Sequence, residues 1–401
     1  MENIHRFRNN QKAIPLGNRG WDEASENRLI ELKVRAVEDD RLEGEAGHRF
    51  INLCSCGYLG LQSHPAILQG AIDAVRKEGV INLSISRLRI RLGILDEMEA
   101  ELSDLFRARA ITALSASVAI SGVLPLIASG HLSDGQPRVM VFDKFCHFSM
   151  NHIKPICADE TLVLTAPHND LNFLEDVCKK HPRVAYVADG VYSMGGAAPV
   201  AELLELQDRY GLFLFFDDSH SLSLWGGRGE GYVRSFYDEL SPLTVIVASL
   251  NKGFGASGGV ILLGPAEQEP TLTRFGGPLA WSQHLNVPSI GAVRAAARIH
   301  ASPELALLQA KLRGNIDLFD REMETGERGN HLPIKLVRVG DEELAVHSSR
   351  ELMRRGFYSS AVFFPIVERG KAGLRVMIRA DNRPEDLLAF SQAVREVMSG
   401  V

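Results

Sequence analysis

Short apolar segments alternate with amphipathic segments along most of the chain. The apolar segments have the length of buried strands, and the segments between them have helical periodicity. Strands are expected at residues 138–142, 161–165, 183–188, 212–216, 244–250 and 259–264. This alternation is typical of an α/β fold, in which a mostly parallel, doubly wound sheet is covered by helices.

Three of the segments between strands carry clear helix signals. DEMEAELSDLF places Met98, Leu102 and Leu105 on one face, and AELLELQDRYG ends at a glycine, Gly211. The apolar segment at 113–130 contains serines and a proline, which indicates a buried helix better than a membrane span.

The pattern changes twice, and these changes predict the domain boundaries. Residues 1–50 are expected to form an N-terminal helical arm, and residues 51–285 a large domain around the sheet. After residue 285 a long helical stretch precedes three short strand patterns and a last helix. We therefore expect residues 286–401 to form a smaller C-terminal α+β domain.

Composition and charge narrow the class of protein. The chain has 401 residues, of which 45% are hydrophobic and 23% charged, and its net charge is −6. These values are typical of a globular enzyme and give no reason to expect a nucleic acid or an anionic membrane as a partner. The start of the chain has no apolar core of a secretion signal, and five scattered cysteines suit a reducing compartment. A cytoplasmic location is expected.

Several predicted strands stop at a polar residue. Asp143, Asp189 and Asp217 follow three of them directly, and Lys252 follows a fourth. In open parallel sheets the carboxyl ends of the strands face the ligand-binding crevice. The segment DDSHS, with Asp217, Asp218 and His220, is therefore a candidate for chemistry.

The glycines after Lys252 need a separate interpretation. Gly253, Gly255 and Gly258 have the G-x-G-x-x-G spacing of dinucleotide-binding folds. However, they lead into another predicted strand, whereas the dinucleotide motif opens a helix. A nucleotide-dependent oxidoreductase is therefore disfavoured.

A lysine that follows a strand, as Lys252 does, can simply be exposed to solvent. Beside Asp217 and His220 from another strand end, it instead suggests pyridoxal 5'-phosphate (PLP). The aldehyde of this cofactor links to a lysine amine, and its ring nitrogen needs a carboxylate to hold a proton.

The ordered motifs resemble those of one enzyme family. NLCSCGYLGLQSHPAI (52–67), DKFCHFS (143–149), DGVYSMGGAAPVAELLELQDRYG (189–211), DDSHS, SLNKGFGASGG (249–259) and GLRVMI (373–378) are similar to the α-oxoamine synthases. That family consists of fold-type-I PLP-dependent acyltransferases, and the resemblance spans roughly residues 50–395. It implies a large domain with a mostly parallel central sheet, a smaller C-terminal domain and a homodimer.

The resemblance also implies roles for individual residues. Lys252 matches the Schiff-base lysine, Asp217 the partner of the pyridine nitrogen, and His220 the partner of the phenolic oxygen. His147 matches the histidine that stacks on the ring; a satisfied core histidine is the alternative. Cofactor contacts are further implied for Ser193, Ser249, Ser117, Val118 and, from a neighbouring subunit, Ser282. Arg375 matches the arginine that binds the substrate carboxylate, for which its planar guanidinium is suited; an exposed strand-edge arginine is the alternative.

The family relationship implies a condensation reaction. An amino acid and an acyl thioester, from coenzyme A or a carrier protein, would give an α-amino ketone after loss of carbon dioxide. An aminotransferase, a PLP-dependent elimination or replacement enzyme, and a non-catalytic scaffold stay open as alternatives. In the segment 87–91, RLRIR, strand-like alternation would place Arg87, Arg89 and Arg91 on one face, where they suit the acidic tail of an acyl donor. A dimer contact or a solvated edge is the alternative interpretation.

Overall fold

A computed structural model describes residues 9–38 and 40–400 of the chain. Contacts divide it into two compact units. The first comprises Leu61–Ser193 and Ala197–Ala306, and the second combines residues 9–60, the short segment Met194–Gly196 and residues 307–400. These limits differ from the predicted boundaries at residues 50 and 285, because the N-terminal segment joins the C-terminal one.

The first unit is built on a seven-stranded sheet of order β4-β10-β9-β8-β7-β5-β6. Its strands are β4 Arg109–Ala113, β5 Val139–Asp143, β6 Val163–Ala166, β7 Val184–Asp189, β8 Phe213–Asp217, β9 Thr244–Ser249 and β10 Gly259–Leu263. β10 is antiparallel to both of its neighbours, and the other pairs are parallel. The sheet is therefore mostly parallel, as expected.

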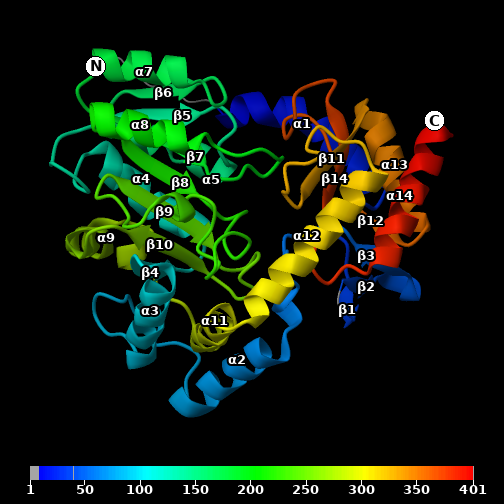
Figure 1. Cartoon of the computed structure of the whole chain (residues 1–401), viewed down its shortest axis with the longest axis horizontal. Coiled ribbons are helices and arrows are strands. Elements are labelled where there is room, and N and C mark those ends of the chain that lie inside the picture. The colour runs from blue at the N-terminus through cyan, green and yellow to red at the C-terminus, as the bar shows by residue number, and fades with distance from the viewer. Residues whose placement is uncertain (1–8, 39, 401) are drawn as a thin grey trace. The chain divides into compact units, whose positions relative to one another are not determined.

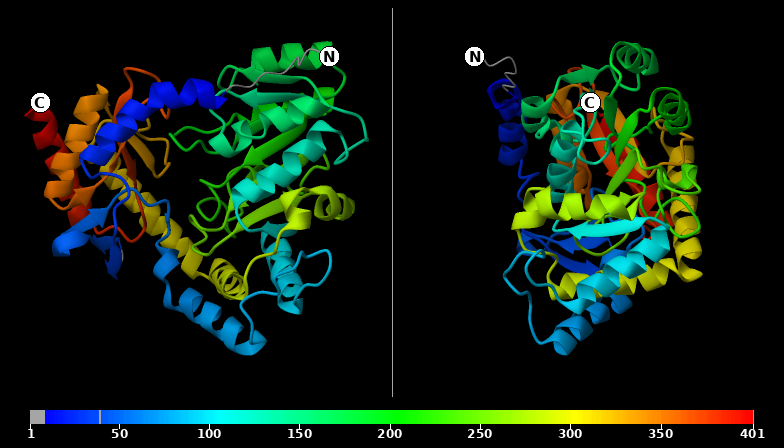
Figure 2. Two further views of the ribbon diagram at one scale, coloured as in Figure 1. Left: turned by 180° about the vertical axis from the view of Figure 1, so that it is seen from behind. Right: turned by 90° about the vertical axis from the view of Figure 1, so that its left-hand side faces the viewer.

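Helices cover this sheet, as Figure 1 and, from behind, Figure 2 show. The helices of the first unit are α2 Pro65–Glu78, α3 Gly93–Phe106, α4 Ala116–Ala128, α5 Phe148–Asn151, α6 Lys154–Glu160, α7 Leu171–Lys180, α8 Val200–Tyr210, α9 Glu269–Phe275, α10 Pro278–Trp281 and α11 Val287–His300. Short 3-10 turns are η2 Leu61–Ser63, η3 Arg234–Phe236 and η4 Ala266–Gln268. The arrangement is an α/β fold.

The core of the first unit lies between α4 and the sheet. α4 packs against β4, β9 and β10. Its Ile120 and Val123 are fully buried in one cluster with Phe213 and Phe215 of β8. The predicted buried helix at 113–130 is thus confirmed. In the part of the chain that the structure describes, no helix combines the length and apolar character needed to span a bilayer.

All six predicted strands are present, with shifts of one or two residues at their ends. β4 was not predicted, because its five residues include Arg109 and Thr112 and show no long apolar run. The RLRIR segment was predicted as a strand, and this is wrong. Residues 87–89 form a turn, and residues 90–92 are irregular up to the start of α3.

The second unit contains two small sheets. One has the order β1-β2-β3-β12 and the other β11-β14-β13. Their strands are β1 Arg35–Glu38, β2 Arg41–Glu43, β3 Arg49–Asn52, β11 Ile334–Gly340, β12 Phe357–Tyr358, β13 Ser360–Val362 and β14 Ala372–Met377. The helices are α1 Asn9–Glu26, η1 Glu45–Gly47, α13 Glu342–Arg354 and α14 Pro384–Ser399, and α12 Glu304–Glu322 begins in the first unit.

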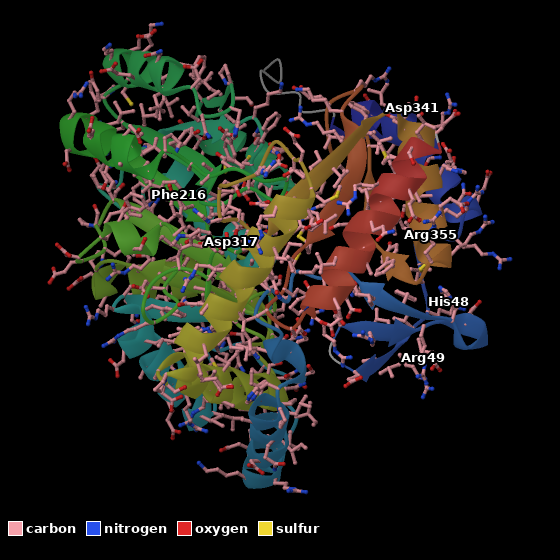
Figure 3. All side chains as sticks on the ribbon, turned by 45° about the vertical axis from the view of Figure 1, so that its right-hand side comes forward. His48, Arg49, Phe216, Asp317, Asp341 and Arg355 are labelled. Atoms are coloured by element: carbon pink, nitrogen blue, oxygen red, sulfur yellow. The ribbon has the colours of Figure 1, made fainter. Side chains whose placement is uncertain are left out.

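The N-terminal arm is therefore only partly helical. α1 fits the expectation for residues 1–50, but β1, β2 and the first half of β3 lie in the same range; residues 1–8 are outside the described part. In β12, Phe357 pairs in parallel with Ile51 of β3. Figure 3 labels His48 and Arg49 beside these strands; His48 Nε2 lies 2.9 Å from the carbonyl oxygen of Met353.

Candidate active site

Three buried aspartates lie at the carboxyl ends of neighbouring strands of the first unit. β5, β7 and β8 are adjacent in the sheet and end at Asp143, Asp189 and Asp217, respectively. In the pairing of β7 with β8, Asp189 lies opposite Asp217. Figure 3 labels Phe216, the residue directly before Asp217. The sequence placed all three residues at strand ends, and the structure brings them to one edge of the sheet.

The proximity of these acids changes the ionisation of one of them. Burial, and then the nearby charge of Asp217, raises the pKa of Asp189 well above its ordinary value. Asp217 Oδ1 accepts a hydrogen bond of 3.1 Å from the backbone N–H of Ser219. The site therefore favours the neutral form of Asp189.

Lys252 lies beside His220 at the same edge of the sheet. Its Nζ is 3.0 Å from His220 Nε2. β9 delivers the lysine through a tight turn in which Gly255 has φ +76°, and a Cβ atom on Gly255 would come 2.3 Å from Cβ of Leu61. A side chain at that position would displace the turn that carries Lys252.

His147 is held by the loop after β5. Its backbone N–H donates to Asp189 Oδ2 over 2.8 Å, and its Nδ1 accepts from the N–H of Ser149. Asp143 shapes the start of this loop by accepting from the N–H of Phe145 at 2.8 Å and from the hydroxyl of Tyr186 at 3.0 Å. Sequence reasoning assigned no role to Asp143 or Asp189, although their strand-end positions were the signal for one.

The N-terminus of α4 lies next to β10. The hydroxyl of Ser115 accepts from the N–H of Val118 at 3.2 Å, which occupies that donor. The remaining first-turn donors include the N–H groups of Ala116 and Ser117, which have no partner inside the helix. A Cβ atom on Gly259 would lie 2.5 Å from the nitrogen of Ala116, so only glycine permits this approach. The turn presents donors to an anion with Ser117 exposed at its surface.

Three other serines of the first unit were predicted to contact the cofactor, and their surroundings differ. Ser249 ends β9, and its hydroxyl makes a short contact with Asn251 Oδ1, while its N–H donates to the hydroxyl of Ser219 over 2.9 Å. Ser193 is half-buried at the end of its segment. The hydroxyl of Ser282 donates to the carbonyl oxygen of Pro278 over 2.7 Å. Ser249 is thereby tied to the loop that carries His220.

Arg375 belongs to β14 in the second unit. Its backbone pairs with Leu336 on one side and with Ser360 on the other. Its Nε is buried and has no hydrogen-bond partner among the described residues. A buried guanidinium nitrogen without a partner is costly, and a bound carboxylate would satisfy it.

The three arginines of RLRIR do not share a face. Arg87 is 5% exposed and forms a two-pronged ion pair with Glu99, with N–O distances of 2.9 and 2.8 Å. Arg91 pairs with Asp96 at 2.7 Å, and Arg89 is exposed. Arg87 is therefore part of the core, and the predicted face of three guanidinium groups is wrong because the segment is a turn.

The residues of the first unit fit PLP. Lys252 would supply the amine, Asp217 would supply a carboxylate for a ring nitrogen, and the first turn of α4 would supply donors for a phosphate. A protonated pyridine bound at this edge of the sheet would bring a positive charge to the buried Asp189 and Asp217. Over residues 9–38 and 40–400, no cluster of three or more His, Cys, Asp or Glu side chains could hold a metal ion.

Comparisons with known proteins identify the family of the chain. The sequence model of the aminotransferase class I and II family matches residues 48–393. Two 8-amino-7-oxononanoate synthases are similar. That of Thermoanaerobacter pseudethanolicus is 28% identical, covering 88% of both chains, and that of Fervidobacterium nodosum is 30% identical, covering 85% of this chain and 86% of the relative.

Solved structures show the same fold. A serine palmitoyltransferase variant from S. paucimobilis with bound PLP superposes with a TM-score of 0.83, at 18% identity, covering 95% of this chain and 96% of that one. The family model thus matches most of the chain, and a curated relative shares 30% of its residues over the aligned part. The chain belongs to the aminotransferase class I and II family and, within it, to the PLP-dependent α-oxoamine synthases.

Proposed function

We propose that this enzyme condenses an amino acid with an acyl thioester and releases carbon dioxide, to give an α-amino ketone. The observation that carries the proposal is the position of Lys252 Nζ, 3.0 Å from His220 Nε2, in a unit whose neighbouring strands end in Asp189 and Asp217. The named relatives are 8-amino-7-oxononanoate synthases, which supports this reaction class.

Each residue has a chemical task in this reaction. PLP, when bound, supplies an aldehyde carbon for an amine and a ring that delocalises electrons from the α-carbon of the amino acid. Lys252 Nζ takes the proton from that α-carbon as general base, and His220 Nε2 orients the amine. Asp217 keeps a proton on the ring nitrogen. His147 covers the ring, and its backbone is held by Asp189.

Further contacts are proposed for the cofactor and the substrate. Ser193 would contact the phenolic oxygen, and Ser249 with the first turn of α4, at Ser117 and Val118, would contact the phosphate. The capped N–H of Val118 leaves that residue a van der Waals role. Arg375 would bind the substrate carboxylate, since its Nε is buried and otherwise lacks a partner among the described residues.

One experiment separates this function from its alternatives. The purified enzyme with PLP is incubated with each amino acid in turn, with and without acyl thioesters of varied chain length. Condensation predicts release of free thiol and carbon dioxide that requires both substrates. Formation of a keto acid or of ammonia without an acyl donor would instead identify an aminotransferase or an elimination enzyme. The absence of any PLP absorbance would indicate a scaffold protein.

We propose that Arg89 and Arg91 bind the acidic tail of the acyl donor. Both are exposed, and Arg91 forms an ion pair with the half-exposed Asp96. The variant Arg89→Gln/Arg91→Gln is expected to raise the KM for a coenzyme A thioester about tenfold, since one or two charge-assisted hydrogen bonds are lost. Steady-state kinetics measure this, and amino-acid binding should stay unaltered.

A thioester that lacks phosphate groups, such as an N-acetylcysteamine thioester, is the matched control for these arginines. Its KM should be the same in the variant and in the wild type. If the variant binds coenzyme A thioesters as the wild type does, the two arginines have a structural role.

We also propose a homodimer in the cytoplasm. Large apolar side chains of α9 and α10 support the dimer, because Phe275 is 70% exposed and Trp281 is 73% exposed. Ser282 follows Trp281 and would reach the phosphate of the neighbouring subunit's cofactor. The five cysteines are all free thiols, which supports a reducing compartment.

A further inference from the structure

His300, the last residue of α11, is a buried histidine with two defined hydrogen bonds. It is 1% exposed, its Nδ1 lies 2.8 Å from the carbonyl oxygen of Ala296, and its Nε2 lies 2.7 Å from the hydroxyl of Ser223. A carbonyl oxygen only accepts, so Nδ1 carries the proton and Nε2 accepts from the Ser223 hydroxyl. The contacts thus select one tautomer of a neutral ring.

The environment keeps this ring neutral. Burial lowers the pKa of His300 to about 4, although the bond to Ala296 acts in the opposite direction. The ring therefore does not change charge between about pH 5 and pH 9. Its contribution is geometric and not that of an acid or base.

One side of the ring holds the loop that carries His220. Ser223 follows His220 by three residues and has φ +77°, a backbone conformation that residues other than glycine rarely adopt. Its N–H donates to the carbonyl oxygen of Gly229 over 2.8 Å. The hydrogen bond from its hydroxyl to His300 adds a second constraint that helps to maintain the strained backbone.

The other side of the ring holds the loop that carries Lys252. The ring of Phe254, two residues after the lysine, stacks on His300 with a centroid distance of 4.4 Å and an interplanar angle of 28°. Between them, Gly253 lies against the first loop: a Cβ atom there would come 2.7 Å from the carbonyl oxygen of Leu222 and 3.2 Å from Cβ of Ser223. One imidazole therefore contacts both loops where they touch each other.

We propose that His300 is a positioning residue, which clamps Ser223 and Phe254 so that His220 Nε2 and Lys252 Nζ stay at hydrogen-bond distance. The ring touches neither of these two atoms and acts through the loops. The proposal rests on the proposed function only in taking Lys252 as the reactive amine. A displacement of about 1 Å at a reacting group costs on the order of 10²-fold in rate.

A cavity gives experimental access to the ring. It has a volume of about 520 Å³ and is lined by His300 together with Arg228, Arg298 and Ser302 among others. The variant His300→Ala would enlarge this cavity by the volume of an imidazole. A small heterocycle in solution can then occupy the space that the side chain leaves.

The test compares His300→Ala with Val293→Ala, a control from the same helix whose side chain is fully buried. Both variants lose packing and should melt at lower temperature. In His300→Ala alone, kcat is expected to fall about 10²-fold with KM changed less than threefold. The pH at which the bound cofactor's visible absorbance changes should also shift, because that titration reports the surroundings of Lys252.

Added imidazole should restore at least part of both properties in His300→Ala. 1-Methylimidazole should not, because it has no N–H to donate to Ala296 while it accepts from Ser223. If His300→Ala does not fold, Ser223→Ala serves instead, since it removes the hydroxyl alone and should shift the same titration. Equal titrations in the wild type, His300→Ala and Ser223→Ala would overturn the proposal, as would equal rescue by both heterocycles.

In the full-length chain from which PLP has been removed, the Lys252 amine is no longer linked to the cofactor, and the rate at which an amine-selective reagent modifies it can be followed by peptide mass as a function of pH. This measurement separates the positioning role from the proposed function. It requires neither substrate nor turnover. If the wild type performs no condensation but Lys252 reactivity still changes in His300→Ala, the proposed function fails and the positioning role stands. An unchanged Lys252 reactivity profile with normal wild-type condensation refutes the positioning role.

Discussion

The variant Lys252→Ala is expected to lose about 10⁴-fold in condensation rate, because it removes the amine that serves as general base next to His220. It should also lose covalent attachment of PLP. The measurement is mass spectrometry after reduction with borohydride, which fixes the cofactor to the residue that holds it. In the wild type the added mass should lie on the peptide that contains Lys252.

Lys179→Ala is the matched control, because Lys179 is a half-exposed lysine on α7 whose partners are surface acids. It should retain both the fixed cofactor and the activity. Attachment of PLP to another lysine in the Lys252→Ala variant, with activity kept, would remove Lys252 from the mechanism.

Asp217→Asn is expected to reduce turnover by about 10²-fold or more, whereas Asp218→Asn should change it less than fivefold. Only Asp217 ends β8 opposite Asp189. Asp218 instead directs Oδ2 to the N–H of Val233, 3.0 Å away. Single-turnover kinetics of the two variants measure the difference, and equal losses would contradict the assignment.

The variant Asp218→Asn is also expected to differ from the wild type in thermal stability. Burial raises the pKa of Asp218 to about 7, from an unfolded value near 4. A raised carboxyl pKa means that the folded protein binds the extra proton, so stability is lost as pH rises through this range. Asparagine mimics the neutral acid. Asp218→Asn should therefore melt at a higher temperature than the wild type at pH 8, with the two curves converging near pH 4.

The strand ends were the most predictable part of the site. The abrupt change from apolar residues to Asp143, Asp189, Asp217 and Lys252 is a local signal, and every one of these positions lies at or just beyond the end of a strand. Buried parallel strands need continuous apolar runs, so their ends are visible in the sequence. The proximity of Lys252 to His220 followed from the same signal, because both residues come shortly after the end of a strand.

Features that depend on distant partners were not predictable. Arg87 looks like one member of a basic strand, yet its burial depends on Glu99, which only the fold brings to it. β1 gives no hydrophobic signal because all four of its residues are exposed. A lone histidine such as His300 carries no signal at all, since its partners Ser223 and Phe254 lie 77 and 46 residues away.

Two strands that lie far apart in the sequence pair in one sheet of the second unit, and this has a consequence during synthesis. β3 pairs with β12, so this edge of the strand that contains Ile51 stays unpaired until Phe357, 306 residues later, has been synthesised. At ~5–20 residues per second, the ribosome needs about 15–60 s to deliver that partner. In this interval the nascent chain carries an unmatched strand edge, which favours association with other chains. Chaperone demand should therefore be greatest for incomplete chains, and C-terminal truncations should accumulate as aggregates even when the Lys252 segment is intact.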